Sequence, residues 1–155
     1  MSRSAYEYAL SLLSARPYTA RNLRRKLVQK EFAVGEVEAA IERLVGNGLL
    51  DDNRYAAQFA RGKLLGPGGS RRRIRQQLFQ RGIKGEVADS AIDSVIAEEE
   101  VNLEAVVEKD ARKKLASLAG LDPLVARRRL YSHLARRGYD LDEINAVMKK
   151  VMKAE

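Results

Sequence analysis

The stretch RQQLFQRGI, residues Arg75–Ile83, has two counterparts elsewhere in the chain. They are RKLVQKEF at Arg25–Phe32 and SHLARRGY at Ser132–Tyr139. All three are basic, and in each a leucine is followed five residues later by a large apolar side chain. A pattern that returns at an interval of about 50 residues indicates a repeated supersecondary unit.

The similarity extends to a set of apolar positions that keep the same register in all three copies. Residues four apart share one helix face, so the first two positions of each copy indicate an amphipathic helix. The later positions indicate a second helix, joined to the first by a short turn. The predicted repeat core is Leu23, Leu27, Phe32 and Ile41 in the first copy, Ile74, Leu78, Ile83 and Ile92 in the second, and Leu130, Leu134, Tyr139 and Met148 in the third.

Capping residues mark the ends of the predicted helices. Thr19, Ser70 and Asp122 stand where the basic helix of each copy would begin, as N-caps. Gly82 and Gly138 stand where that helix would end in the left-handed conformation. A further helix is expected before each pair, over residues 5–15, 52–65 and about 98–119.

The sequence therefore predicts an all-α fold of three tandem three-helix repeats, stacked into an elongated curved body. We call these repeats the first, second and third units and expect them over residues 1–48, 49–97 and 98–155. A unit of about 50 residues buries little surface alone. We therefore expect neighbouring units to supply the missing part of each core, with breaks between helices at Gly46–Gly48 and Gly66–Gly69.

Composition argues against an enzyme. The chain has no cysteine and one histidine, His133, which we expect at the surface. A nucleophilic Ser–His–Asp site and a metal site built from imidazoles both need more than this, so no catalytic residue, cofactor or metal is expected. The acidic pair Asp51–Asp52 and the run Glu98–Glu100 are interpreted as helix-start residues that complement the helix dipole.

The chain also lacks the sequence features of membrane and secreted proteins. No run of about 20 apolar residues is present to span a bilayer, and polar residues interrupt the N-terminal apolar segment that a signal peptide would need. We expect a soluble, cytoplasmic protein that is monomeric and has no membrane partner.

The net charge of +8 favours a polyanionic partner. The charge gathers on the first of the two paired helices in each copy, and the second unit is the most basic. Arginine dominates there, and its planar fork matches phosphate and carboxylate groups. A solvated helix face is the simpler interpretation for any single arginine, but the segment Arg71–Arg81 contains no acidic residue. The candidate contact residues are Arg21, Arg24, Arg25, Arg71, Arg72, Arg73, Arg75, Arg81, Arg127, Arg128, Arg136 and Arg137.

One apolar residue departs from this pattern. Phe79 lies among the arginines, away from the apolar stripe of its helix, and Val28 is its counterpart in the first copy. We expect Phe79 either to pack against a neighbouring unit or to stack on a partner.

Four segments resemble the RecX family, and together they cover nearly the whole chain. They are SARPYTARNLRRKL (14–27), GLLDDNRYAAQFA (48–60), RIRQQLFQRGI (73–83) and LARRGYDLDEI (134–144). The resemblance implies a non-enzymatic regulator of the recombinase RecA that acts in DNA repair, homologous recombination and the SOS response. It implies binding in the groove of the RecA filament on DNA, which restrains filament growth, ATP hydrolysis and strand exchange.

A second hypothesis is a direct DNA-binding protein of the helix-turn-helix type, with Arg75 and Gln76 presented to bases. Contacts with single- and double-stranded DNA would be weaker and sensitive to salt, because phosphate binding releases counterions. An RNA-binding or scaffold repeat is a third class, but the chain has few aromatic residues on which bases could stack.

Overall fold

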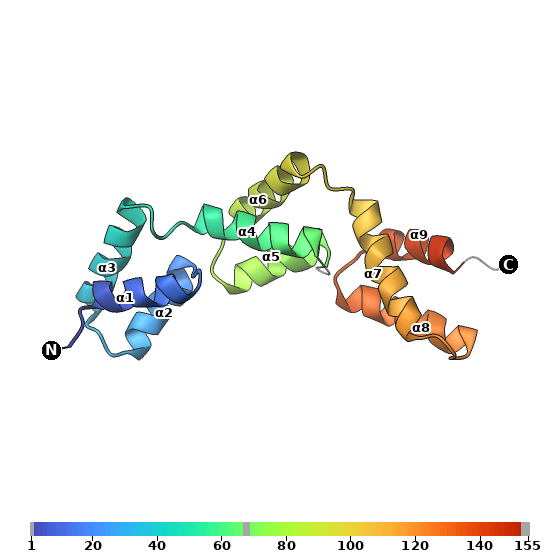
Figure 1. Ribbon diagram of the computed structural model, residues 1–155, viewed down its shortest axis with the longest axis horizontal. Coiled ribbons are helices and arrows are strands. Elements are labelled where there is room, and N and C mark those ends of the chain that lie inside the picture. Colours follow the sequence, from blue (N-terminus) through green and yellow to red (C-terminus); the bar gives the residue numbers. More distant parts are fainter. Residues whose placement is uncertain (1, 67–68, 153–155) are drawn as a thin grey trace.

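The computed structural model describes residues 2–66 and 69–152 of the chain. Every regular element in these residues is a helix, which confirms the all-α class. Figure 1 shows the helices gathered in groups that follow one another along the long axis of the molecule, and the contacts between helices assign three helices to each group. The helices are α1 (Ala5–Ala15), α2 (Ala20–Gln29), α3 (Val34–Gly46), α4 (Asp52–Leu65), α5 (Arg71–Gln80), α6 (Gly85–Glu98), α7 (Leu103–Ser117), α8 (Pro123–Arg136) and α9 (Leu141–Val151).

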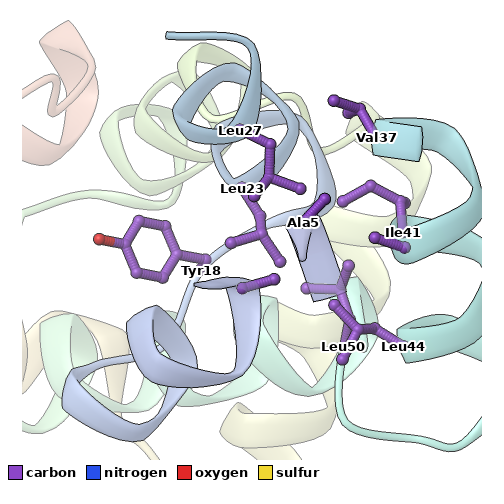
Figure 2. Packing of buried hydrophobic residues seen from close by; sticks show 10 residues of the cluster. Ala5, Tyr18, Leu23, Leu27, Val37, Ile41, Leu44 and Leu50 are labelled. Atoms are coloured by element: carbon purple, nitrogen blue, oxygen red, sulfur yellow. The ribbon is translucent and has the colours of Figure 1, made fainter. Parts of the chain in front are cut away.

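The first unit shows how each group is packed. Leu23 and Leu27 on α2 are fully buried between α1 and α3. On α1, Ala5 lies beside these leucines (Figure 2). Ala9 belongs to the same buried cluster, and the small side chains of both alanines allow the helices to approach closely. On α3, Ile41 is buried in the same cluster. Burying a leucine side chain contributes about 1.5–3 kcal/mol, so these leucines account for a large share of the stability of the unit.

The three apolar clusters are separate. Each contains ten buried residues, and these come from one unit apart from Leu50 of the first cluster, which lies in the segment between α3 and α4. The expectation that neighbouring units complete each other's core is therefore wrong. A unit closes its own core because its three helices pack in a triangle around the leucine stripe of the middle helix.

Eleven of the twelve predicted core residues are buried. Phe32 is the exception, because it is only partly buried and packs beside Tyr8 at a ring-centroid distance of 6.0 Å. Its counterparts Ile83 and Tyr139 are 2% and 5% exposed. They follow turns that the preceding unit covers, whereas no described unit covers the turn before Phe32.

Local capping chemistry explains most helix ends. Thr19, Ser70 and Asp122 cap α2, α5 and α8 as predicted. Asp51 caps α4, and its side chain accepts hydrogen bonds from two backbone N–H groups of the first turn. Of the predicted break at 66–69, Gly66 follows the end of α4, and Pro67 and Gly68 lie outside the described residues.

The start of the third unit differs from the prediction. The run Glu98–Glu100 ends α6 instead of opening α7, and Glu100 has a positive φ of 51°. Asn102 caps α7, and its side chain accepts a hydrogen bond from the Ala105 N–H at 3.2 Å. The amide side chain that bonds to the first turn therefore decides where this helix begins.

The units meet through a polar connector that occurs twice. The Thr19 hydroxyl donates to the carbonyl of Arg81 at 2.7 Å, and the Ser70 hydroxyl donates to the carbonyl of Arg137 at 3.2 Å. Each bond joins the N-cap of one middle helix to the C-cap of the next. The middle helices α2, α5 and α8 thus follow one another head to tail, with opposite ends of their dipoles in contact.

Glycine is required at each connector. Gly82 and Gly138 have φ values of 87° and 90°, which confirms the predicted left-handed conformation. A Cβ on Gly82 would lie 2.6 Å from the Cβ of Arg21, and one on Gly138 would lie 2.8 Å from the Ser70 hydroxyl oxygen. Neither distance leaves room for a side chain, so the glycine allows the two helix ends to approach.

Candidate interaction surface

The middle helices α2, α5 and α8 carry the predicted contact residues, and the structure divides these residues into three groups. The first group is exposed and makes no ion pair within the described part of the chain. Arg21, Arg72 and Arg128 occupy one repeat position, two residues before the first core residue of their units. The whole group is Arg21, Arg25, Arg72, Arg127, Arg128 and Arg136.

A second group is paired with acidic residues on the third helix of the same unit. Arg24 bonds Glu38 at 2.6 Å, and Arg75 lies 3.2 Å from Asp89 at the same repeat position. Arg71 pairs with Asp93. These pairs are exposed, and such pairs contribute about 0.2–1 kcal/mol each. Their main effect is to hold the guanidinium groups against α3 and α6.

These pairs were not expected from the sequence. The segment Arg71–Arg81 has no acidic residue of its own, but α6 lies alongside α5 and supplies Asp89 and Asp93. The positive charge of the second unit is therefore partly compensated on its own surface.

A third group belongs to the connectors. The Arg73 guanidinium donates to the carbonyl of Arg136 at 2.6 Å, across the boundary between the second and third units. Arg81 donates to the carbonyl of Gln77 and lies over the ring of Phe59, 4.6 Å from its centroid. Arg137 has its Nε 3.9 Å from an oxygen of Asp110. These three side chains are held in place by the fold.

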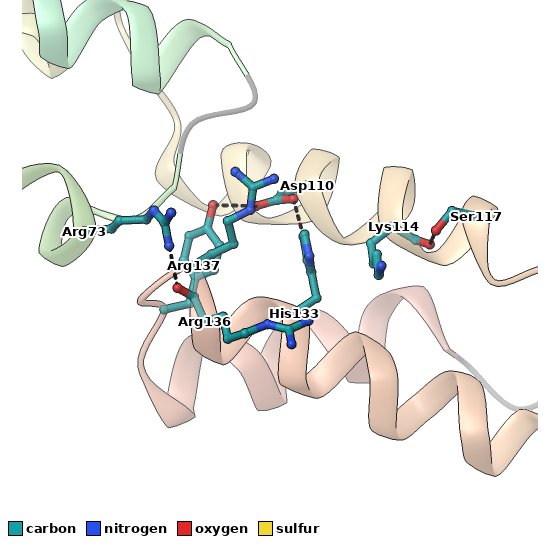
Figure 3. Close-up of polar contacts among 8 residues, drawn as sticks. Arg73, Asp110, Lys114, Ser117, His133, Arg136 and Arg137 are labelled. Atoms are coloured by element: carbon teal, nitrogen blue, oxygen red, sulfur yellow. Dashed lines mark hydrogen bonds and ion pairs between the residues drawn. The ribbon is translucent and has the colours of Figure 1, made fainter. Parts of the chain in front are cut away.

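A buried polar network surrounds Asp110 on α7 (Figure 3). The Asp110 side chain is 7% exposed, and its Oδ1 lies 2.9 Å from Nε2 of His133. The Tyr139 hydroxyl donates to its Oδ2 at 3.3 Å. Because a buried carboxylate without partners is costly, these contacts with His133, Tyr139 and Arg137 are what allow it to lie inside the unit.

The network also shifts the pKa of Tyr139 and holds His133 away from the surface. Burial, together with the charge of Asp110, raises the pKa of the Tyr139 hydroxyl well above its usual range. Tyr139 therefore stays a hydrogen-bond donor beyond the pH of about 10 at which an ordinary tyrosine loses its proton. The His133 side chain is only 16% exposed and faces Asp110, so the expectation of a surface histidine is wrong.

The origin of this network becomes clear when equivalent positions of the three units are compared. Asp110 precedes the buried Ala111 just as Tyr8 precedes Ala9 and Phe59 precedes Ala60. In the first two units a cation of the middle helix's C-cap lies over the aromatic ring, Lys30 at 5.4 Å and Arg81 at 4.6 Å. A carboxylate takes the place of the ring in the third unit. The polar residue at an aromatic position was the available sequence signal.

Phe79 does not pack against a neighbouring unit within the described part of the chain. Its side chain is 69% exposed, and its counterpart Val28 is 54% exposed. The expectation of inter-unit packing is wrong because the units touch through helix caps and turns instead of helix faces. Stacking of Phe79 on a partner stays a prediction.

Two kinds of site are absent from residues 2–66 and 69–152. No cluster of three or more His, Asp or Glu side chains there is arranged to hold a metal ion. No helix of the same residues has the length and apolar character needed to cross a membrane.

Comparison with protein families decides the relationship. Models described as the first, second and third three-helix domains of RecX match residues 5–44, 51–92 and 102–148. The chain belongs to the RecX family. Each matched domain includes the middle helix of one unit, α2, α5 or α8. The six buried leucines and isoleucines of these helices therefore lie inside the family match.

Named RecX relatives resemble the chain over most of its length. "Regulatory protein RecX" of Trichlorobacter lovleyi is 36% identical over 149 residues, covering 94% of each chain. The protein of the same name from Actinobacillus pleuropneumoniae is 34% identical and covers 94% of this chain and 91% of its own. A RecX protein of a Mycobacterium strain is 36% identical over 87% of this chain and 74% of its own.

Solved RecX structures share the fold. A crystal structure of regulatory protein RecX superposes with a TM-score of 0.79 at 24% identity, covering 94% of this chain and 71% of that chain. RecX from Lactobacillus salivarius gives a TM-score of 0.76 at 18% identity, covering 97% of this chain and 96% of its own. The row of three units is therefore a known RecX architecture.

Proposed function

We propose that this RecX protein regulates the RecA recombinase and is a regulator without enzymatic activity. It acts in the cytoplasm as a monomer, in DNA repair, homologous recombination and the SOS response. It binds in the groove of the RecA–DNA filament and restrains filament growth, ATP hydrolysis and strand exchange. The observation that carries this proposal is the match of all three units to RecX domains, in a chain whose named relatives are regulatory proteins.

The contact surface is the row of exposed arginines on the middle helices. The head-to-tail connectors hold α2, α5 and α8 in sequence, so Arg21, Arg72 and Arg128 recur at regular positions along the array. These residues have no intramolecular carboxylate to satisfy them within the described chain. Arg24, Arg71 and Arg75 contribute less, because a partner must first displace Glu38, Asp93 or Asp89.

The extended shape supports binding to several filament subunits at once. We take residues 1–48, 49–97 and 98–155 as the three contact modules. When one module is bound, its neighbours are held close to the filament, and the effective concentration of each is raised. A ligand that fits one filament geometry better than others stabilises that geometry. This restrains the conformational cycle that accompanies ATP turnover.

Contacts with single- and double-stranded DNA are a weaker and salt-sensitive part of the proposal. Recognition of bases by Arg75 and Gln76, as in a helix-turn-helix protein, is less favoured by the structure than by the sequence alone. The guanidinium group of Arg75 is engaged by Asp89 at 3.2 Å. DNA would therefore be bound mainly through its phosphates.

The test is ATP hydrolysis by RecA filaments on single-stranded DNA, measured as this protein is added. We expect inhibition at stoichiometric amounts. The triple variant Arg21→Ala/Arg72→Ala/Arg128→Ala should require about tenfold more protein for half-inhibition, which corresponds to about 1.4 kcal/mol.

The matched control is Arg24→Ala/Arg75→Ala/Arg112→Ala, which removes the same charge from arginines that have intramolecular partners. It should inhibit nearly as well as the unmodified protein. An equal loss of inhibition in both variants would mean that overall charge determines binding, and not the row of exposed arginines. No inhibition by the unmodified protein would contradict the proposed function.

A further inference from the structure

Two adjoining hollows lie on the surface of the first unit, and the larger of them reaches the second unit. Arg16, Tyr18, Asn22 and Arg25 line both of them. One hollow, of about 330 Å³, extends to the C-terminal end of α5 and includes Arg81. The other, of about 270 Å³, extends along α2 to Lys26. We call the two hollows together the junction pocket.

The junction pocket is strongly basic. Arg16, Arg25, Lys26 and Arg81 line it, and no aspartate or glutamate is among its lining residues. Within the described residues Arg16, Arg25 and Lys26 make no ion pair. The contrast with Arg24, one residue away and bonded to Glu38, shows that acidic partners are provided on one side of α2 and not on the other.

Parts of the pocket wall are fixed before any ligand binds. Arg16 lies over the ring of Tyr18, 4.5 Å from its centroid, and Tyr18 is itself buried. Arg81 is held over Phe59 and bonded to the carbonyl of Gln77. Side chains ordered in this way lose less conformational entropy when they bind, which favours affinity.

The chemistry of the pocket fits the backbone of a single strand of nucleic acid. Guanidinium groups match phosphate oxygens bidentately. Lys26 continues the positive wall along α2, where an adjacent phosphate would lie. Tyr55 adds an aromatic group beside the larger hollow, and Asn22 and Gln80 add amides that can hydrogen-bond to a base or a sugar.

We propose that the junction pocket binds a backbone phosphate of single-stranded DNA between Arg16, Arg25 and Arg81. The inference rests on the proposed function for the presence of DNA, but the site is formed by this chain alone. The proposal assigns single-strand binding to the boundary between two units. The connector brings Arg81 of the second unit beside Arg16 and Arg25 of the first.

The test is a fluorescence anisotropy titration of a labelled twelve-residue oligothymidine with the full chain, in the absence of recombinase. Arg25→Ala should weaken binding about fivefold and lower the slope of log K against log salt by about 0.7, the value for one phosphate of a single strand. Arg24→Ala is the matched control, since it removes the same charge from the neighbouring position. It should change the affinity less than twofold.

Two further measurements locate the site. The side-chain amide signals of Asn22 and Gln80 should shift in the NMR spectrum when the oligonucleotide is added. Inorganic phosphate at millimolar concentration should compete only weakly. Equal effects of Arg24→Ala and Arg25→Ala, or oligonucleotide-induced shifts confined to α8, would overturn the proposal.

Tight binding of inorganic phosphate without oligonucleotide binding would also overturn it, because the pocket would then be a small-anion site. Failure of this titration would leave the regulation of RecA standing, because no recombinase is present. Failure of the ATP hydrolysis test would equally leave the junction pocket untouched.

Discussion

The hydroxyl of Thr19 bonds the carbonyl of Arg81 at 2.7 Å and so connects the start of α2 to the end of α5. The same hydroxyl accepts a hydrogen bond from the Asn22 N–H at 3.2 Å and caps its own helix. One side chain therefore stabilises both a helix end and the boundary between two units, and Ser70 does the same at the next boundary.

Thr19→Ala should cost more than an ordinary cap substitution. We expect about 2 kcal/mol from the combined loss of the cap and of the bond to Arg81. Ser4→Ala is the control, because Ser4 caps α1 by one hydrogen bond and, within the described residues, makes no hydrogen bond to another unit. It should cost about 1 kcal/mol. The measurement is urea unfolding, and similar costs for the two variants would show that the bond between units adds nothing.

Gly82→Ala should destabilise the protein and loosen the boundary between the first two units. Its φ is 87° and its Cβ would meet Arg21, so we expect a loss of more than about 1 kcal/mol. Gly62→Ala is the opposite case. Gly62 lies inside α4 with open space around it, so alanine there should stabilise by about 0.5–1 kcal/mol. Thermal melts of both variants check these signs, and a stable Gly82→Ala protein would contradict the connector.

Asp110→Ala should destabilise the third unit by about 2 kcal/mol or more, because it leaves His133 and the buried hydroxyl of Tyr139 without their acceptor. Glu108→Ala is the control on the same helix. Glu108 pairs with Arg112 and Lys150 at the surface, so its loss should cost less than about 1 kcal/mol. The comparison uses denaturant unfolding of both variants, and a neutral Asp110→Ala would show that the network is not needed.

Alkaline pH should weaken the fold through Tyr139. Its pKa in the folded protein lies above the ordinary value of about 10, so the unfolded chain loses this proton first as pH rises. The contribution is fully present below pH 10 and declines above it, by about 1.4 kcal/mol per pH unit. Tyr139→Phe should remove this part of the slope. Unfolding of the two proteins between pH 9 and 11 provides the measurement, and parallel curves would contradict the assignment.

Local chemistry made much of the fold predictable. The N-caps Thr19 and Ser70 and the left-handed Gly82 and Gly138 depend on neighbours within a few residues, and the helix pattern locates them. The repeat register then gives the number of helices and the residues that face inward. The prediction that Glu98–Glu100 begins a helix is wrong because a solvent-facing acidic run is tolerated at the C-terminal end of a helix as well as at the N-terminal end.

Contacts between elements were harder to predict. The pairing of Arg71 with Asp93 depends on how α6 lies along α5, which a helical pattern does not specify. The burial of His133 depends on a carboxylate 23 residues away in the chain. The junction pocket requires two units to be placed against each other through a hydroxyl and a carbonyl, and hydrophobic periodicity carries no information about such a contact.

The turn of the first unit holds Glu31 where the later turns hold Gly82 and Gly138, and Glu31 has a φ of 69°. Its backbone already has the form that the connector uses, but Glu31 carries a Cβ, and at the equivalent Gly82 and Gly138 a Cβ would collide with the preceding unit. The same chemistry at that turn would therefore first require a residue without a side chain at position 31. An engineer who wished to lengthen the array in that direction would begin by replacing Glu31 with glycine.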